Sequence, residues 1–173
     1  MNSRELEATA YYEAGHAVVG AIRDRPPITV SVVPDGDVAG RNDFPEDWLP
    51  EFRGHFGGSP AERAYIETRI LTGVAGTIAH DLRFPGRVHD AGDVNDNGGA
   101  RAILEDNAGW ADDDRDGYFR QLCANARDLL QTNWPWVEAV AVALIVRKTI
   151  SGAEVMQLRP HTQPAARDSS LKS

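Results

Sequence analysis

Apolar positions near the start of the chain follow a helical period. Small and apolar side chains recur there every three or four residues: Leu6, Ala10, Ala14, Ala17 and Val18. This spacing predicts one helix over residues 3–23. Asn2, with Glu5 three residues later, is typical of a capped helix start, and the Pro26-Pro27 pair ends the pattern.

The pattern then changes to the period of a β-strand. Residues 28–33 read "ITVSVV", in which β-branched residues alternate with polar ones, and a strand is expected. The apolar positions of its buried face are Ile28, Val30 and Val32. The stretch "PDGD" at 34–37 predicts a turn, with a short return strand at 38–41 and a loop over 42–58.

The rest of the chain returns to helical spacing. Further helices are expected at 59–82, from about 94, at 112–132, at 135–148 and from 151. Ser59 with Glu62 is typical of a capping box, and "SGAE" at 151–154 predicts the start of the last short helix. We therefore expect one α+β domain over residues 1–158, mostly helical with a small β-sheet beside the first helix. The polar stretch 159–173 is expected to be a disordered tail.

Composition narrows the classes of function. The 173 residues carry a formal net charge of −8, which disfavours nucleic acid or an anionic membrane as a partner. The longest apolar run, 137–146, is about half of the ~20 residues that a membrane helix needs. The first residues lack the pattern of a signal peptide, so a cytoplasmic location is expected.

The single cysteine, Cys123, excludes an internal disulfide and a cysteine zinc cluster, and its apolar helical setting predicts a core position. The acidic run from Asp112 to Asp116 is interpreted as a solvated helix start.

Chemistry is suggested by "YYEAGHAVVG" at residues 11–20. Positions 12 and 16 share one helix face, and a histidine at position 12 would complete a His-Glu-x-x-His zinc-peptidase motif. Such a motif supplies two imidazole ligands and a glutamate that acts as general base. By itself the Glu-x-x-His pattern of Glu13 and His16 is also typical of an ordinary helix with a surface glutamate and a partly buried histidine.

Five segments in order carry a resemblance to a family: "AYYEAGHAVVG", "ITVSVVPDGDVAGR", "LTGVAGTIAHDL", "GDVNDNGGARAIL" and "TISGAEVMQL". Over about residues 5–158 the chain resembles the peptidase domain of the FtsH family of zinc proteases, in its small stand-alone form. The resemblance implies zinc, a peptide or protein substrate, Glu13 as catalytic glutamate, and His16 and Asp96 as metal ligands that converge in one cleft. Asp93 is the less favoured match for the third ligand.

The resemblance also implies a strand that binds the substrate peptide, and one missing motif argues against ATP as a cofactor. The strand with Ile28, Val30 and Val32 would border the cleft and pair an extended peptide along one free edge. The chain has no Gly-x-x-x-x-Gly-Lys phosphate loop, so ATP is not expected.

Tyr12 stands where the family has its first histidine ligand. A phenol with an ordinary pKa of about 10 costs roughly 4 kcal/mol to ionise at pH 7, and it is longer than an imidazole. Zinc is therefore expected to bind weakly or not at all. Two hypotheses remain open: a metallopeptidase of low or no activity, and a pseudopeptidase that binds a peptide or protein.

The other histidines and the tryptophans complete the candidates. His80 and His89 are possible replacement ligands, although an exposed or capping role is more typical of such positions. His55 and His161 are expected to be solvent groups. Two tryptophans, Trp134 and Trp136, are expected to pack at a helix entry.

Overall fold

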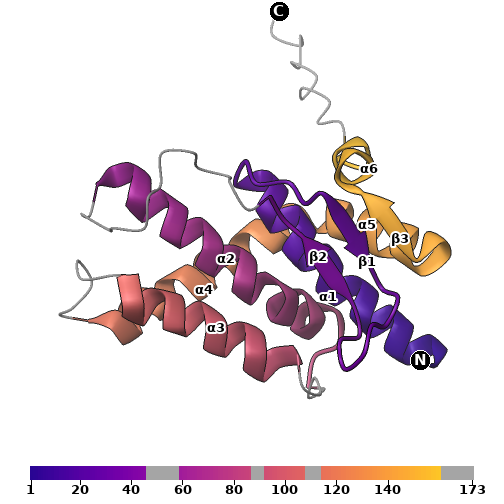
Figure 1. Ribbon diagram of the computed structural model, residues 1–173, viewed down its shortest axis with the longest axis horizontal. Helices are drawn as coiled ribbons and strands as arrows, with labels where there is room; N and C mark the ends of the chain where they lie inside the picture. The colour runs from indigo at the N-terminus through magenta and orange to yellow at the C-terminus, as the bar shows by residue number, and fades with distance from the viewer. Residues whose placement is uncertain (46–58, 87–91, 108–113, 161–173) are drawn as a thin grey trace, which may run out of the picture.

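The computed structural model describes residues 1–45, 59–86, 92–107 and 114–160, and for residues 92–97 and 107 it describes the backbone alone. These residues form helices and short strands in the following order: α1 Ser3–Ile22, β1 Thr29–Ser31, β2 Arg41–Asp43, α2 Pro60–Arg83, α3 Gly92–Asn107, α4 Arg115–Thr132, α5 Trp134–Arg147, β3 Thr149–Ser151 and α6 Gly152–Gln157 (Figure 1). The fold is mainly helical with a small antiparallel sheet, so the expected α+β class is confirmed.

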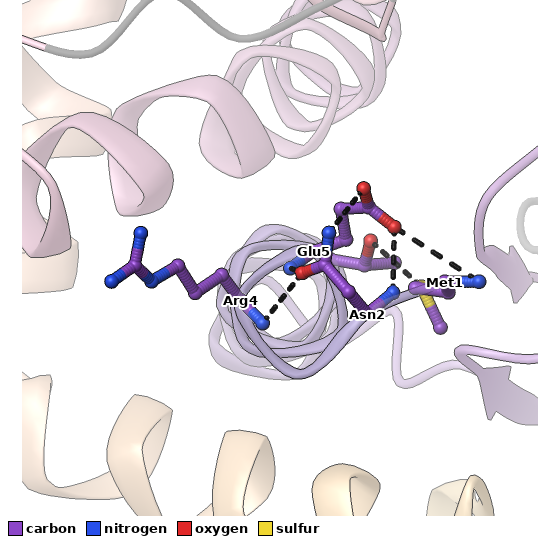
Figure 2. A network of polar contacts seen from close by, with 5 residues as sticks. Met1, Asn2, Arg4 and Glu5 are labelled. Atoms are coloured by element: carbon purple, nitrogen blue, oxygen red, sulfur yellow. Dashed lines mark hydrogen bonds and ion pairs between the residues drawn. The ribbon is translucent and has the colours of Figure 1, made fainter.

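Helix α1 begins at the cap that the sequence predicts. The Asn2 Oδ1 atom accepts hydrogen bonds from the Arg4 and Glu5 backbone N–H groups, at 2.9 and 3.0 Å (Figure 2). The Glu5 carboxylate accepts in return from the Asn2 backbone N–H at 2.7 Å. These bonds satisfy helix N–H groups that have no partner within the helix, which fixes where α1 starts.

The pair α1 and α2 lies at the centre of the molecule. Helix α5 packs on α1, while α3 and α4 cover α2 (Figure 1). The two central helices approach closely at Gly15, where a Cβ atom would lie 2.5 Å from the Ala75 carbonyl oxygen and 2.6 Å from the Ala79 Cβ. A residue larger than glycine at position 15 would therefore push the two helices apart.

The sheet has the order β2-β1-β3, and both pairings are antiparallel. Val30 of β1 lies opposite Asn42 on one side and Ile150 on the other. The expectation that the strand has one unpaired edge is wrong, because β3 occupies the second edge of β1. Strand β3 was not expected from the sequence; it has three residues and lies between α5 and α6.

The expected apolar face of the strand is confirmed in part. Val30 and Val32 are fully buried, whereas Ile28 is 59% exposed. Ile28 precedes β1, and its backbone already bonds to two neighbours, Asp43 and Gly152, at the end of the sheet. Its side chain therefore does not continue the alternation of the strand.

The return strand begins later than the expected 38–41. The backbones of Asp35 and Val38 bond to each other in both directions, at 2.9 and 3.1 Å, and close a tight turn. This turn removes Val38 from pairing with β1, so the ladder starts at Arg41 and includes residues that were expected to be loop.

The C-terminal half packs as expected around its tryptophans. Trp136 is buried and its Nε1–H donates to the Val155 carbonyl at 2.8 Å, while Trp134 stacks on Tyr11. Cys123 is only half-buried on α4, where its side chain packs against the core. Asp114 caps α4, as the interpretation of a helix start requires.

Some of the sequence-based predictions concern residues that the structure does not describe. Asp112, Asp113 and the stretch 161–173 lie outside the described residues. Among the described residues, no single helix has the length and apolar composition to cross a membrane. Taken together, α4 and α5 have that length and composition, but there is a bend of 77° between them.

Candidate functional site

The side chains of Tyr12, Glu13 and His16 all lie in the interior, because α1 is buried on all its faces from Thr9 to Ala21. The sheet, α2 and α5 surround this part of the helix. Glu13 is 5% exposed, so the interpretation of position 13 as an ordinary surface glutamate is wrong. A buried carboxylate is costly without hydrogen-bond donors, so its surroundings must supply them.

His16 is held by the backbone of α2. Its Nδ1 lies 2.6 Å from the Thr72 carbonyl oxygen, which can only accept, so Nδ1 carries the proton. In the neutral ring the Nε2 atom then has the lone pair. Histidines that bind zinc through Nε2 commonly have this partner on the other nitrogen.

Gly76 makes room for the His16 ring. A Cβ atom at position 76 would lie 2.2 Å from His16 Nε2 and 2.7 and 2.8 Å from the adjacent ring carbons. A point in line with the Nε2 lone pair would be farther from both carbons than this. Gly76 therefore lies against the face of the imidazole and does not block the lone-pair direction of Nε2.

Tyr12 packs against the same imidazole. The two rings meet edge to face, with centroids 4.9 Å apart and an interplanar angle of 79°. This contact confirms that positions 12 and 16 share one helix face. It also gives the buried Tyr12 ring a packing role beside His16.

Glu13 is bound to the sheet by Asn42. The Asn42 Nδ2 atom donates to Glu13 Oε2 at 2.6 Å and to the Glu13 carbonyl at 3.1 Å. Gly40 lies close on the other side, since a Cβ there would be 2.6 Å from Glu13 Oε1. The carboxylate thus joins α1 to β2. Sequence reasoning missed Asn42, because it lies in a stretch that was expected to be loop.

Helix α2 presents further polar side chains to the interior: Thr68, Thr72, Thr77 and His80. The expectation of an exposed His80 is wrong, since this side chain is 3% exposed and its ring centroid lies 5.3 Å from that of Phe84. His80 lies in the last turn of α2, near the helix end as expected, but its side chain is buried. The threonines in the middle of α2, on either side of Gly76, could have indicated from the sequence that this face of the helix contacts polar groups.

The remaining candidate ligands lie outside what the structure describes. Asp96 and Asp93 belong to α3, which packs on α2, but their side chains are among those not described, and His55, His89 and His161 lie outside the described residues. The side chains that are described contain no group of three or more His, Cys, Asp or Glu placed to hold a metal ion.

Among the described residues, His16 alone has the setting of a zinc ligand. His16 offers Nε2 with its other nitrogen fixed by a carbonyl, as a zinc-binding imidazole requires. Tyr12 offers a phenol, which is a poor ligand in its protonated form. A catalytic zinc centre needs three protein ligands, and the described side chains supply one good ligand, His16.

Comparison with protein-family models and with curated proteins gives no match for this sequence.

Proposed function

We propose that this chain is a metallopeptidase-type domain of the FtsH kind with a degenerate metal site, and that it hydrolyses peptides slowly or not at all. The observation that carries the proposal is the setting of His16. A buried imidazole on α1 has its Nδ1–H bonded to the Thr72 carbonyl, one turn of helix from Glu13. A surface Glu-x-x-His pattern would have no need for this arrangement.

The assignment of roles rests on the resemblance. His16 and Asp96 are the residues that would hold zinc, and Glu13 is the residue that would act as base. Zinc at such a site activates a water molecule for attack on a peptide bond. Tyr12 removes one of the ligands that such a site needs, and Asn42 already occupies one oxygen of Glu13. Both features lower the expected activity.

A pseudopeptidase is the second candidate, and the sheet favours it. Because β1 is paired on both sides, an extended peptide would have to add to an outer strand. Strand β2, which is bound to Glu13 through Asn42, has no strand partner on its outer side among the described residues. A peptide paired with Arg41–Asp43 would lie beside the candidate site without requiring a metal.

Metal content and hydrolysis, measured together, test the proposal. Protein purified without chelator should contain far less than one zinc per chain by elemental analysis. Its hydrolysis of an unstructured protein such as casein should not exceed that of the Glu13→Gln variant. One zinc per chain, with hydrolysis that disappears in Glu13→Gln, would show an active peptidase and overturn the proposal of a degenerate site.

A further inference from the structure

The hydrogen bonds of β1 determine which backbone groups of β2 face the edge of the sheet (Figure 1). The Val32 N–H donates at 2.8 Å to the carbonyl of Lys148, which directly precedes β3. The N–H of Gly152, which directly follows β3, donates at 2.8 Å to the Ile28 carbonyl. Backbone groups of successive residues point to opposite sides of a strand, so Val30, midway between Ile28 and Val32, also faces β3.

The backbone of Asn42 consequently faces away from β1. Asn42 lies opposite Val30 in the β1–β2 pairing. Because the Val30 backbone faces β3, these two residues exchange no backbone hydrogen bond, and the Asn42 N–H and C=O point to the outer side of β2. The Ile28 N–H donates to the Asp43 carbonyl at 2.6 Å, which agrees with a backbone of Asp43 that faces β1. Among the described residues no strand pairs with the outer side of β2, so Asn42 offers one donor and one acceptor to an added strand.

The side chains of β2 divide between the two faces of the sheet. Asn42 lies on the inner face, where it donates to Glu13. Arg41 and Asp43 alternate with it and lie on the outer face. The Arg41 Nε atom lies 2.8 Å from Asp43 Oδ1, and the two side chains are 63% and 41% exposed. An added strand would therefore meet a positive charge on one side of Asn42 and a negative charge on the other.

We propose that the outer side of β2 prefers an extended peptide of the pattern basic–x–acidic, with residue x opposite Asn42. This inference rests on the second proposed function, that of a peptide-binding domain. The peptide would run antiparallel to β2, as both existing pairings of the sheet do. Its residue before x then lies opposite Asp43, and its residue after x lies opposite Arg41.

The geometry of the pairing favours these two side-chain contacts. Residue x and Asn42 would exchange the backbone hydrogen bonds, so the flanking positions form pairs without such bonds. Side chains approach more closely in these pairs than in hydrogen-bonded ones. A lysine before x and a glutamate after x would each lie opposite the other sign of charge, whereas the reverse order would oppose like charges.

An NMR titration of the isotope-labelled whole chain tests this inference, with the Asn42 amide as reporter. Two probes are blocked peptides of identical composition, Thr-Val-Lys-Thr-Glu-Val-Thr and Thr-Val-Glu-Thr-Lys-Val-Thr. A third probe is the first peptide N-methylated at its central residue, which removes the N–H that would donate to the Asn42 carbonyl. The variant Arg41→Asp with Asp43→Arg exchanges the two charges of β2. Its matched control is Arg127→Asp with Asp128→Arg, which exchanges two exposed charges on α4.

The Lys-x-Glu peptide should bind about fivefold or more tightly than its isomer to the unmodified protein and to the control, because two opposite-charge pairs replace two like-charge pairs. Exchange of Arg41 and Asp43 should reverse this preference, and N-methylation should abolish binding. Both side chains of β2 are exposed, so the exchange retains the fold.

Equal affinity for the two peptides, or a preference that survives the exchange of Arg41 and Asp43, would overturn the sequence preference and leave peptide binding in place. Undiminished binding of the N-methylated peptide would overturn the pairing at Asn42. Absence of saturable binding by either peptide would overturn this inference together with the peptide-binding candidate. The peptidase candidate would still be decided separately, by zinc content and hydrolysis.

Discussion

From the contact between Gly76 and His16 we predict how much the variant Gly76→Ala lowers the free energy of unfolding. The added Cβ would lie 2.2 Å from His16 Nε2, so the ring must move. The ring has little freedom, because its Nδ1 is bonded to the Thr72 carbonyl at 2.6 Å and the Tyr12 ring packs against it. Relief of the clash therefore requires loss of that bond or separation of α1 from α2.

The expected cost combines three effects. Overpacking costs about 1–3 kcal/mol, and leaving a buried group without its hydrogen bond costs about 1–3 kcal/mol more. The higher helix propensity of alanine returns about 1 kcal/mol. Gly76→Ala should thus lower the free energy of unfolding by about 3 kcal/mol.

Urea denaturation followed by circular dichroism measures this change. Gly99→Ala is the matched control, since it lies in a helix with no atom within 4 Å of an added Cβ, and it should not destabilise the protein. In a His16→Ala background, where the ring is absent, Gly76→Ala should cost little or even stabilise. If Gly76→Ala were as stable as Gly99→Ala, or if its cost persisted without the His16 ring, the reasoning would be refuted.

Three further predictions concern polar contacts. Asn42→Ala removes the donor to the buried Glu13 carboxylate and should lower the free energy of unfolding by about 2 kcal/mol in urea denaturation; an unchanged value would contradict this role. Asn2→Ala removes the cap of α1 and should cost about 1 kcal/mol in the same assay, whereas Asn2→Asp should retain most of the stability. Hydrogen bonds from the Ser151 backbone and hydroxyl hold the pKa of Glu154 below its ordinary value of 4.5. The stability that Glu154 contributes is present above that value and is lost as the pH falls through the lowered pKa. An NMR titration of the Glu154 carboxyl should show this lowered pKa and its return toward 4.5 in Ser151→Ala; equal values in the two proteins would contradict the assignment.

The helices were predictable because their signals are local. The caps at Asn2 and Ser59 each involve residues within three positions, and both form as expected. The sheet was harder, because its pairing joins distant segments, as Val30 and Ile150 illustrate. A three-residue strand such as β3 has too few positions for an alternation to be recognised.

In the candidate site, too, the contacts between residues close in sequence were predictable and the contacts between distant residues were not. The sequence places Tyr12 and His16 on one face of a helix, which the ring contact confirms. It does not identify their partners: Thr72 lies 56 residues from His16, and Asn42 lies 29 residues from Glu13. Burial of Glu13 was missed for a related reason, since it depends on how the sheet covers α1 rather than on the helical pattern.

Tyr12 is the residue on which the proposal of a degenerate metal site depends most, and calorimetric titration of zinc tests its effect most directly. The protein as it stands should bind zinc weakly or not at all, because an ordinary phenol must lose its proton, at a pKa of about 10, to become a strong ligand, and Tyr12 lies where a second imidazole is needed. Tyr12→His places two imidazoles four residues apart on α1, with Glu13 between them, and should raise zinc affinity by orders of magnitude. Tight stoichiometric binding by the unmodified protein, or equal affinity in the two forms, would contradict the account.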